Sequence, residues 1–351
     1  MVEEMTSMER VMAVLNREEP DRVPVVFIAT TIGAREAGVN VPEYATDGKK
    51  MAEGQLNFLK RYGVDLVTPG SGIASLAEAF GTTTKYYDTQ YDSPAVGEPA
   101  VKKPEDWEKL EFKTITPGMI ASLEAGQIIH DEVGDTVPIM GGIISPLTVA
   151  TWVAGMSDAL RATKKNPEAL HKGLKIIADQ ESQMVEAQIS MGAKIFMVVC
   201  TRATRDIFTD EQYAEFGIPY DLKVLEHLKG KDAHVMVHVC GNVPMLKTII
   251  EKYPISAVNW WDRGTQYNLE EIKEKYGDKI IIVGGLDQTR TLIIGTPQEV
   301  EEQAKDAIRQ AAAGGGFMLS AGCELGAITP PENILAAVNA AKKYGKYPLS
   351  L

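Results

Sequence analysis

Short apolar runs alternate with longer amphipathic segments along most of the chain. Runs of β-branched and other apolar residues predict strands at 23–31, 64–72, 136–142, 193–200, 232–241, 255–262, 279–287 and 316–323. Segments with apolar residues at helical spacing predict helices at 5–17, 51–63, 167–192, 210–230, 243–253, 269–277, 297–315 and 330–345. The helix at 210–230 is expected to break near Pro219, because proline cannot donate the helical hydrogen bond.

Residues 80–118 interrupt this alternation. They are rich in Tyr, Thr, Pro and charge, so we expect hairpins and turns there. About eight strand-then-helix units account for the rest, as is typical of a parallel sheet covered on both faces. The pattern favours an α/β fold of the (β/α)8 TIM-barrel type, a single domain over 1–351 with an N-terminal extension and an irregular excursion at 80–118. The nucleotide-binding folds lose support, since no G-x-G-x-x-G follows the first strand and no P-loop is present.

The composition excludes several classes of function. The 351 residues carry 48 acidic and 36 basic side chains, a formal net charge of −12, which is unlike the basic surface of a nucleic-acid or anionic-membrane binder. No apolar run approaches the roughly 20 residues that span a bilayer. The N-terminus lacks the pattern of a signal peptide. Since three cysteines are too few for a disulfide framework, we expect a cytoplasmic protein.

The strand in VMVHVCGN (235–242) ends in two residues that can bind a metal. Because side chains at i and i+2 of a strand point to the same face, His238 and Cys240 can aim at one point. Cys323 ends the last strand, just before Glu324, and chemistry in α/β barrels sits at the carboxyl ends of the strands. His238, Cys240 and Cys323 would give zinc three ligands and one open position. Equally, two small strand residues and a buried histidine would explain the same spacing.

Five further residues at strand ends are candidates for substrate binding. Cys200 is either a fourth ligand or, more simply, a buried thiol. Asp262 and Asp287 either orient ligands or cap the helices that follow. Trp260 and Trp261 could line a pocket for a flat ligand, although at least one of them fits the core equally well. Whether Cys200 or Glu324 approaches the metal stays open.

Several segments resemble the uroporphyrinogen decarboxylase superfamily, and the resemblance runs nearly end to end. They are NREEPDRVPV (16–25), GGIISPLTVATWVAG (141–155), MGAKIFMVV (191–199), HVCGN (238–242) and GGFMLSAGCELGAITPPENILAAVNAAKKYG (315–345). The fold of that family is a (β/α)8 barrel, which agrees with the pattern of strands and helices. The resemblance therefore implies the same fold as the periodicity.

Two branches of this superfamily matter. The decarboxylases resemble one another in an N-terminal RQAGRY-type segment whose arginines hold the porphyrinogen carboxylates, and they are metal-free. The corresponding stretch here is FIATTIGAREAG (27–38), in which Arg35 alone does not restore the segment. The corrinoid-dependent methyltransferases have a zinc motif of H-x-C and a distant cysteine in a G-C-E context. His238, Cys240 and Cys323 match this motif, so the resemblance implies a catalytic Zn²⁺ site.

Methyl transfer is the reaction that this resemblance implies. A methyl group would move between the cobalt of a corrinoid, carried by a separate protein, and a small substrate. That substrate would be a thiol such as coenzyme M or a methoxylated aromatic (O-demethylation). The D-x-H-x-x-G signature of a corrinoid-binding module is missing, so cobalamin would be a visiting co-substrate. The alternatives are a uroporphyrinogen decarboxylase-like decarboxylase and a non-catalytic ligand-binding barrel.

Overall fold

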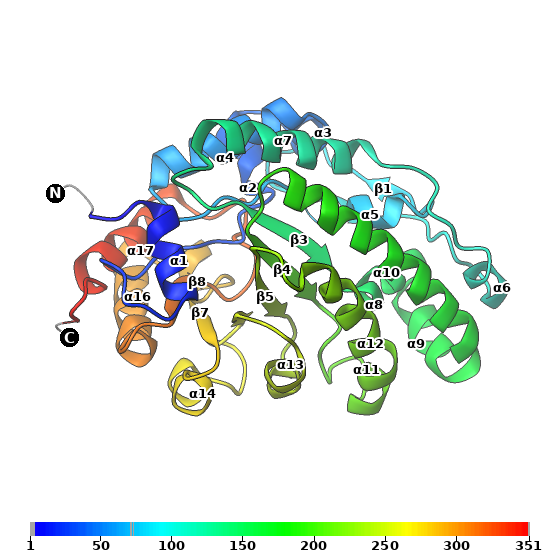
Figure 1. Cartoon of the computed structure of the whole chain (residues 1–351). Helices are drawn as coiled ribbons and strands as arrows, with labels where there is room; N and C mark the ends of the chain where they lie inside the picture. Colours follow the sequence, from blue (N-terminus) through cyan, green and yellow to red (C-terminus); the bar gives the residue numbers. More distant parts are fainter. Residues whose placement is uncertain (1–3, 71, 73, 350–351) are drawn as a thin grey trace.

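Six parallel strands form one sheet in the order in which they follow along the chain (Figure 1). The computed structural model describes residues 4–70, 72 and 74–349. The strands are β3 (Met140–Ile144), β4 (Ile195–Cys200), β5 (His234–Val239), β6 (Ala257–Trp260), β7 (Ile281–Leu286) and β8 (Phe317–Ala321). Each overlaps a strand expected from the sequence.

Two extended segments connect β8 back to β3. Val25 forms a parallel bridge with Leu319 of β8. The backbone N–H of Asp65 then donates to the carbonyl of Val25 at 2.8 Å, and that of Met140 donates to the carbonyl of Val67 at 2.9 Å. The two segments thus occupy the first two positions of an eight-membered ring, as the predicted TIM-barrel fold requires.

The strands expected at 23–31 and 64–72 are therefore extended chain with isolated bridges, and neither forms a regular ladder. Two local causes explain the difference. Pro24 has no N–H to donate to a neighbouring strand. The N–H of Val25 donates at 2.8 Å to the side-chain carboxylate of Asp65. A carboxylate here takes the place that a backbone carbonyl has in a ladder.

Helices surround the sheet, and every predicted helix is present. Those that overlap predictions are α1 (Ser7–Leu15), α4 (Gly48–Tyr62), α10 (Pro167–Ser190), α11 (Asp210–Phe216), α12 (Ile218–Leu225), α13 (Leu246–Lys252), α14 (Leu269–Tyr276), α16 (Pro297–Ala311) and α17 (Pro331–Tyr344). The predicted break in 210–230 falls at Gly217, between α11 and α12. No helix of the described residues is long and apolar enough to cross a membrane.

Several helices were not predicted. The long ones are α7 (Pro117–Val133), α8 (Pro146–Val153) and α9 (Met156–Lys165). The short ones are α2 (Ile32–Ala37), α3 (Val41–Thr46), α5 (Ala74–Glu78), α6 (Pro104–Trp107), η1 (Glu226–Leu228) and α15 (Thr291–Ile294). Helices α7 and α8 both begin with a proline at the first helical position, which is a start signal that the periodicity alone does not include.

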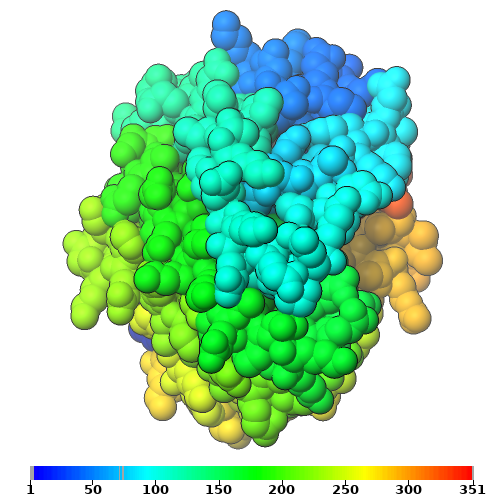
Figure 2. All heavy atoms as spheres, turned by 90° about the vertical axis from the view of Figure 1, so that its right-hand side faces the viewer, coloured from blue at the N-terminus to red at the C-terminus, as the bar shows by residue number. Residues whose placement is uncertain are grey.

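The excursion at 80–118 contains the expected turns and one hairpin. Strands β1 (Thr84–Lys85) and β2 (Ala95–Val96) pair antiparallel, and helix α6 follows them. The buried Trp107 of α6 fixes this segment to the rest of the fold. Figure 2 shows that the segment, in cyan, lies across the side of the molecule toward which the strands of Figure 1 point. It therefore belongs to the face where barrel chemistry is expected.

Side chains of the strands alternate between the inside of the ring and the surrounding helices. The inner set is one apolar cluster, which includes Met197, Met236 and Met318. Val11 and Val14 of α1 belong to the same cluster, so α1 plugs one end of the ring. The opposite end, at the carboxyl termini of the strands, holds the candidate site.

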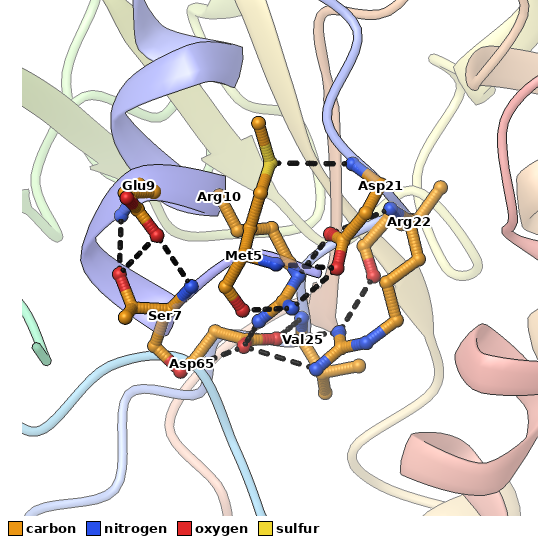
Figure 3. A network of polar contacts seen from close by, with 10 residues as sticks. Met5, Ser7, Glu9, Arg10, Asp21, Arg22, Val25 and Asp65 are labelled. Atoms are coloured by element: carbon orange, nitrogen blue, oxygen red, sulfur yellow. Dashed lines mark hydrogen bonds and ion pairs between the residues drawn. The ribbon is translucent and has the colours of Figure 1, made fainter. Parts of the chain in front are cut away.

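A buried ionic network fixes α1 to the extended segments (Figure 3). Arg10 of α1 donates to Asp65 at 2.8 Å and to Asp21 at 2.6 Å. Arg22 donates to the other oxygen of Asp65 at 2.8 Å. The side chains of Arg10 and Asp65 are fully buried, so each charge depends on its partners for compensation.

Candidate metal centre

The structure brings the three predicted ligands together at the carboxyl ends of β5 and β8. His238 lies in β5 and points into the ring, while Cys240 follows two residues later on the same face. Cys323 lies just beyond β8. The ligand atoms of the three residues all lie within 4.8 Å of one another, and Cys323 Sγ is 3.5 Å from His238 Nε2.

Asn259, which sequence analysis missed, orients the histidine. It lies on β6 directly opposite His238 in the sheet register. Its amide nitrogen donates to the carbonyls of Val283 at 2.9 Å and Ala321 at 3.0 Å. Its oxygen is therefore an acceptor, 2.7 Å from His238 Nδ1. Nδ1 must carry the hydrogen, which leaves the lone pair of Nε2 free toward the cysteines.

The pKa values of the two thiols are shifted in opposite directions. The hydrogen bond with the Cys323 thiol holds the pKa of Cys240 far below its usual range. The same contact raises the pKa of Cys323, because a second thiolate beside the first would be repelled. A thiolate at Cys240 is the form of cysteine that binds metals.

These residues fit a zinc ion by their chemistry. Two sulfur atoms and one imidazole nitrogen are ligands that zinc prefers, and three protein ligands leave a position for substrate. Among the described residues the cluster includes no carboxylate, which disfavours magnesium or calcium. Asn259 supplies the second hydrogen bond that metal-binding histidines usually make.

A cavity of about 250 Å³ adjoins the cluster, and His238 and Cys323 form part of its wall. Most of the wall is apolar, and it includes the methionines Met119, Met140, Met184 and Met197. Glu324 also lies in the wall, where its carboxylate accepts hydrogen bonds from the Thr30 hydroxyl and the Thr31 backbone. Glu324 therefore contacts the cavity and is outside the metal cluster.

A second acid, Glu181 of α10, lies in the same wall. Glu181 is only 2% exposed to solvent. Burial raises the pKa of Glu181 to about 8. Sequence analysis missed it because α10 carries many charged residues, and only the helix packing shows that this one faces inward.

Cys200 does not join the cluster, contrary to the interpretation of it as a ligand or substrate contact. It pairs in register with Val239, one residue beyond His238, so its side chain points out of the ring. There its sulfur lies 3.8 Å from the carboxylate of Asp221, which also accepts hydrogen bonds from Tyr213 and Tyr253. It is the buried thiol of the simpler interpretation.

The side chain of Trp260 also points out of the ring, contrary to the interpretation that it lines the substrate pocket. Its side chain is fully buried, and its indole N–H donates at 2.9 Å to the carbonyl of Tyr267. It follows Asn259, which points inward, so strand alternation places it against the helices. Trp261 lies in the loop beyond β6, and neither tryptophan is in the wall of the cavity.

Asp262 and Asp287 support loops and are not in the cavity wall either. Asp262 accepts a hydrogen bond from the Gly285 N–H at 2.9 Å and pairs with Arg263 at 3.2 Å. Burial raises its pKa to about 6. Asp287 accepts hydrogen bonds from the backbone of Thr289 and Arg290, which fixes the turn before α15. The structure thus favours the capping interpretation for Asp287.

The fold and site define the chain as a parallel α/β barrel whose carboxyl end has a His-Cys-Cys cluster that could hold a metal ion. The family model of uroporphyrinogen decarboxylase (URO-D) matches residues 6–344, and the chain belongs to this family. The methylcobamide:CoM methyltransferase MtbA of Methanosarcina mazei is 29% identical over 348 residues, which are 97% of this chain and 99% of that protein. The uroporphyrinogen decarboxylase of Chromohalobacter salexigens is 23% identical, over 95% and 96% of the two chains.

A solved structure shows the same fold. A methyltransferase from Methanosarcina mazei superposes with a TM-score of 0.85 at 24% identity, over 97% of this chain and 99% of that one. The predicted barrel fold is thus confirmed. The resemblance to the corrinoid-dependent methyltransferase branch is confirmed too, because similar relatives include methylcobamide:CoM methyltransferases from more than one Methanosarcina species.

Proposed function

We propose that the protein is a zinc-dependent methyltransferase. It moves a methyl group between the cobalt of a corrinoid, carried by a separate protein, and a small molecule in the cavity. The observation that carries this proposal is the cluster of His238, Cys240 and Cys323, whose histidine is oriented by Asn259 and which adjoins the cavity. The similarity to methylcobamide:CoM methyltransferases supports it.

In this proposal some residues of the chain hold the metal and others enclose the substrate. His238, Cys240 and Cys323 would hold zinc, which supplies Lewis acidity that keeps a thiol substrate as thiolate or polarises a leaving heteroatom. The apolar methionine side chains of the wall keep water from the methyl group. The carrier protein would present its corrinoid at the carboxyl end of the barrel.

The substrate in this proposal is a thiol such as coenzyme M or a methoxylated aromatic, and transfer in either direction is compatible with the site. The burial of Trp260 removes one argument for an aromatic ligand. A uroporphyrinogen decarboxylase activity is disfavoured, because Arg35 donates to the carbonyls of Ala327 at 2.8 Å and Thr329 at 2.7 Å. It serves the packing of these segments and not a substrate carboxylate.

Zinc content per chain tests the proposal. We expect about one zinc in the parent protein and its loss in His238→Ala, Cys240→Ala and Cys323→Ala, because two protein ligands rarely hold zinc tightly. Cys200→Ala is the matched control and should keep its zinc, since its thiol points out of the ring. Methyl transfer from methylcobalamin to a thiol should fall by more than about 100-fold in the three ligand variants.

Three outcomes would contradict the proposal. Full zinc content in both Cys240→Ala and Cys323→Ala would show that these cysteines are not zinc ligands. Formation of coproporphyrinogen from uroporphyrinogen would favour the decarboxylase. Bound zinc without methyl transfer to or from any thiol or methyl ether would favour a ligand-binding barrel.

A further inference from the structure

The charges in the cavity wall restrict what the cavity can bind. Besides His238 and Cys323, the ionisable side chains in the wall are the acids Glu181 and Glu324. The described residues of the wall include no lysine and no arginine. A buried sulfonate or carboxylate needs a cation or several donors to replace its hydration. The described part of the wall offers hydroxyl and amide groups, such as those of Ser75, Ser122 and Gln188, but no cationic side chain, so it suits a neutral or cationic ligand better than an anion.

The nearby arginines make their hydrogen bonds elsewhere. Arg202 follows the wall residue Thr201, but its Nε donates to the Thr151 hydroxyl at 2.8 Å and its Nη1 to the Thr201 carbonyl at 3.2 Å. Arg35 donates to backbone carbonyls, as described above. Neither side chain is part of the wall, although the Arg202 guanidinium lies close enough to Cys240 to interact electrostatically with its thiolate.

The N-terminus of α7, which lies in the cavity wall, also offers few hydrogen-bond donors to an anion. Helix N-termini bind anions through free backbone N–H groups. The first residue of α7, Pro117, has none, and the N–H of Met119 already donates to the Thr116 hydroxyl at 3.2 Å. Pro117 and Met119 thus have no free N–H for an anion, which leaves that of Gly118 in the first turn.

Glu181 is the polar group best placed to contact a ligand. It lies in the wall and is nearly fully buried, and among the described residues it forms no ion pair with a basic side chain. Its carboxylate accepts a hydrogen bond from the backbone of Ile144. Its carboxyl can donate a hydrogen bond to a neutral ligand when protonated and attract a cation when ionised.

We propose that the small substrate of this methyltransferase carries no negative charge, and that Glu181 is its polar anchor. This inference rests on the proposed function. A thiol or methyl donor with a neutral or cationic end fits the wall, while the sulfonate of coenzyme M would meet two acids and, among the described residues of the wall, no lysine or arginine. The chain therefore differs in substrate class from relatives whose names include coenzyme M.

Three thiols of the same two-carbon length test the inference on the zinc-loaded chain. They are 2-mercaptoethanol, 2-mercaptoethylamine and 2-mercaptoethanesulfonate, which is coenzyme M. We expect the neutral and cationic thiols to bind at least about tenfold more tightly than the sulfonate, a difference of 1.4 kcal/mol. Titration calorimetry gives the affinities, corrected for the ionisation of each thiol, and methylcobalamin assays give the rates.

A second series does not depend on a zinc-bound thiolate. The same order is expected for 3-methoxybenzyl alcohol and 3-methoxybenzylamine against 3-methoxybenzoate. Equal or tighter binding of the anion in either series would overturn the inference, as would a lack of binding in both. Loss of zinc and of all methyl transfer, with the charge preference kept in the methoxy series, would instead overturn the proposed function alone.

Glu181→Gln tests the anchor, because glutamine keeps the size and removes the acid. At a pH above about 8, where Glu181 is ionised, we expect the preference for the cationic over the anionic ligand to narrow by at least about fivefold, roughly 1 kcal/mol. Glu186→Gln is the control on the same helix, where Glu186 is exposed and pairs with Lys231. An unchanged preference in Glu181→Gln would show that Glu181 is not the anchor.

Discussion

The two ends of the barrel contrast in how their buried polar groups are paired. At the end covered by α1, Asp65 accepts hydrogen bonds from Arg10, Arg22 and the backbone of Val25. At the other end, His238 and the two cysteines converge on one point, with Cys323 Sγ 3.5 Å from His238 Nε2. The closed end neutralises its charges within the chain, whereas the open end leaves donor atoms facing a cavity.

This difference separates a structural polar cluster from a functional one. Buried charges that are fully paired within the chain hold segments together and have no group left to bind a ligand. Buried ligand atoms that are oriented but not satisfied favour a bound ion or substrate. The contrast also applies within the open end, where Asp287 is satisfied by its own turn and Glu181 is not paired with a base.

The largest effect is expected from Asp65→Asn, at the closed end. Removing the carboxylate takes away a buried counter-charge that Arg10 and Arg22 share, which should cost about 3–5 kcal/mol of unfolding free energy. Urea unfolding gives the value. Asp232→Asn is the matched control, because that side chain is 78% exposed beside Lys194, and it should cost less than about 1 kcal/mol. A small loss for Asp65→Asn would show that the network does not hold α1.

Asn259→Ala should lower zinc affinity by about 10–100-fold, because His238 loses the partner that orients it. Chelator competition measures the affinity. Asn259→Asp keeps an acceptor for Nδ1 but gives up the hydrogen bonds to Val283 and Ala321. We expect it to restore zinc affinity while lowering stability, and a failure to restore it would assign Asn259 a purely structural role.

Glu181 should make stability depend on pH. Its pKa is raised from 4.5 to about 8 in the folded chain, so between these values the folded state holds a proton that the unfolded state has lost. Its contribution therefore destabilises the fold as pH rises, by roughly 2 kcal/mol between about pH 6 and pH 8. Glu181→Gln should remove this part of the slope in urea unfolding, whereas Glu186→Gln should keep it. Equal slopes in all three proteins would contradict the assignment.

The smallest effect is expected from Asp287→Ala, which lies at the open end but only fixes a turn. Loss of its hydrogen bonds to the backbone of Thr289 and Arg290 should cost about 1 kcal/mol, as for a helix cap. Zinc content and thiol affinity should stay at parent values. A loss of zinc in Asp287→Ala would extend the functional cluster to this residue.

Much of the fold could be predicted because strands β3–β8 and their helices have clear apolar periodicity. The first two ring positions were misjudged for a local reason. Pro24 cannot donate, and the carboxylate of Asp65 takes the N–H of Val25, so extended chain replaces two strands. Helix α7 was missed because it begins at a proline after the irregular excursion, and α8 because its residues are buried all round and show no apolar periodicity.

The candidate site was partly predictable for a reason of geometry. His238 and Cys240 share a face by strand alternation alone, and only the ring brings Cys323 to them. Cys200 could not be placed from sequence, because a parallel strand is apolar on both faces and gives no sign of which one is inward. Asn259 and Glu181 needed the register of β5 with β6 and the packing of α10, which no local pattern contains.

The hydrogen bond from the Val26 N–H to the carbonyl of Leu319 has a consequence for folding. It joins the first ring position to the last, so the ring cannot close until β8 has been synthesised. Contacts between residues so distant in sequence form slowly, since a long loop must be ordered first. Cys323 arrives with the same final strand. Completion of the metal site is thus a late event in folding, and metal uptake should report when the barrel has closed.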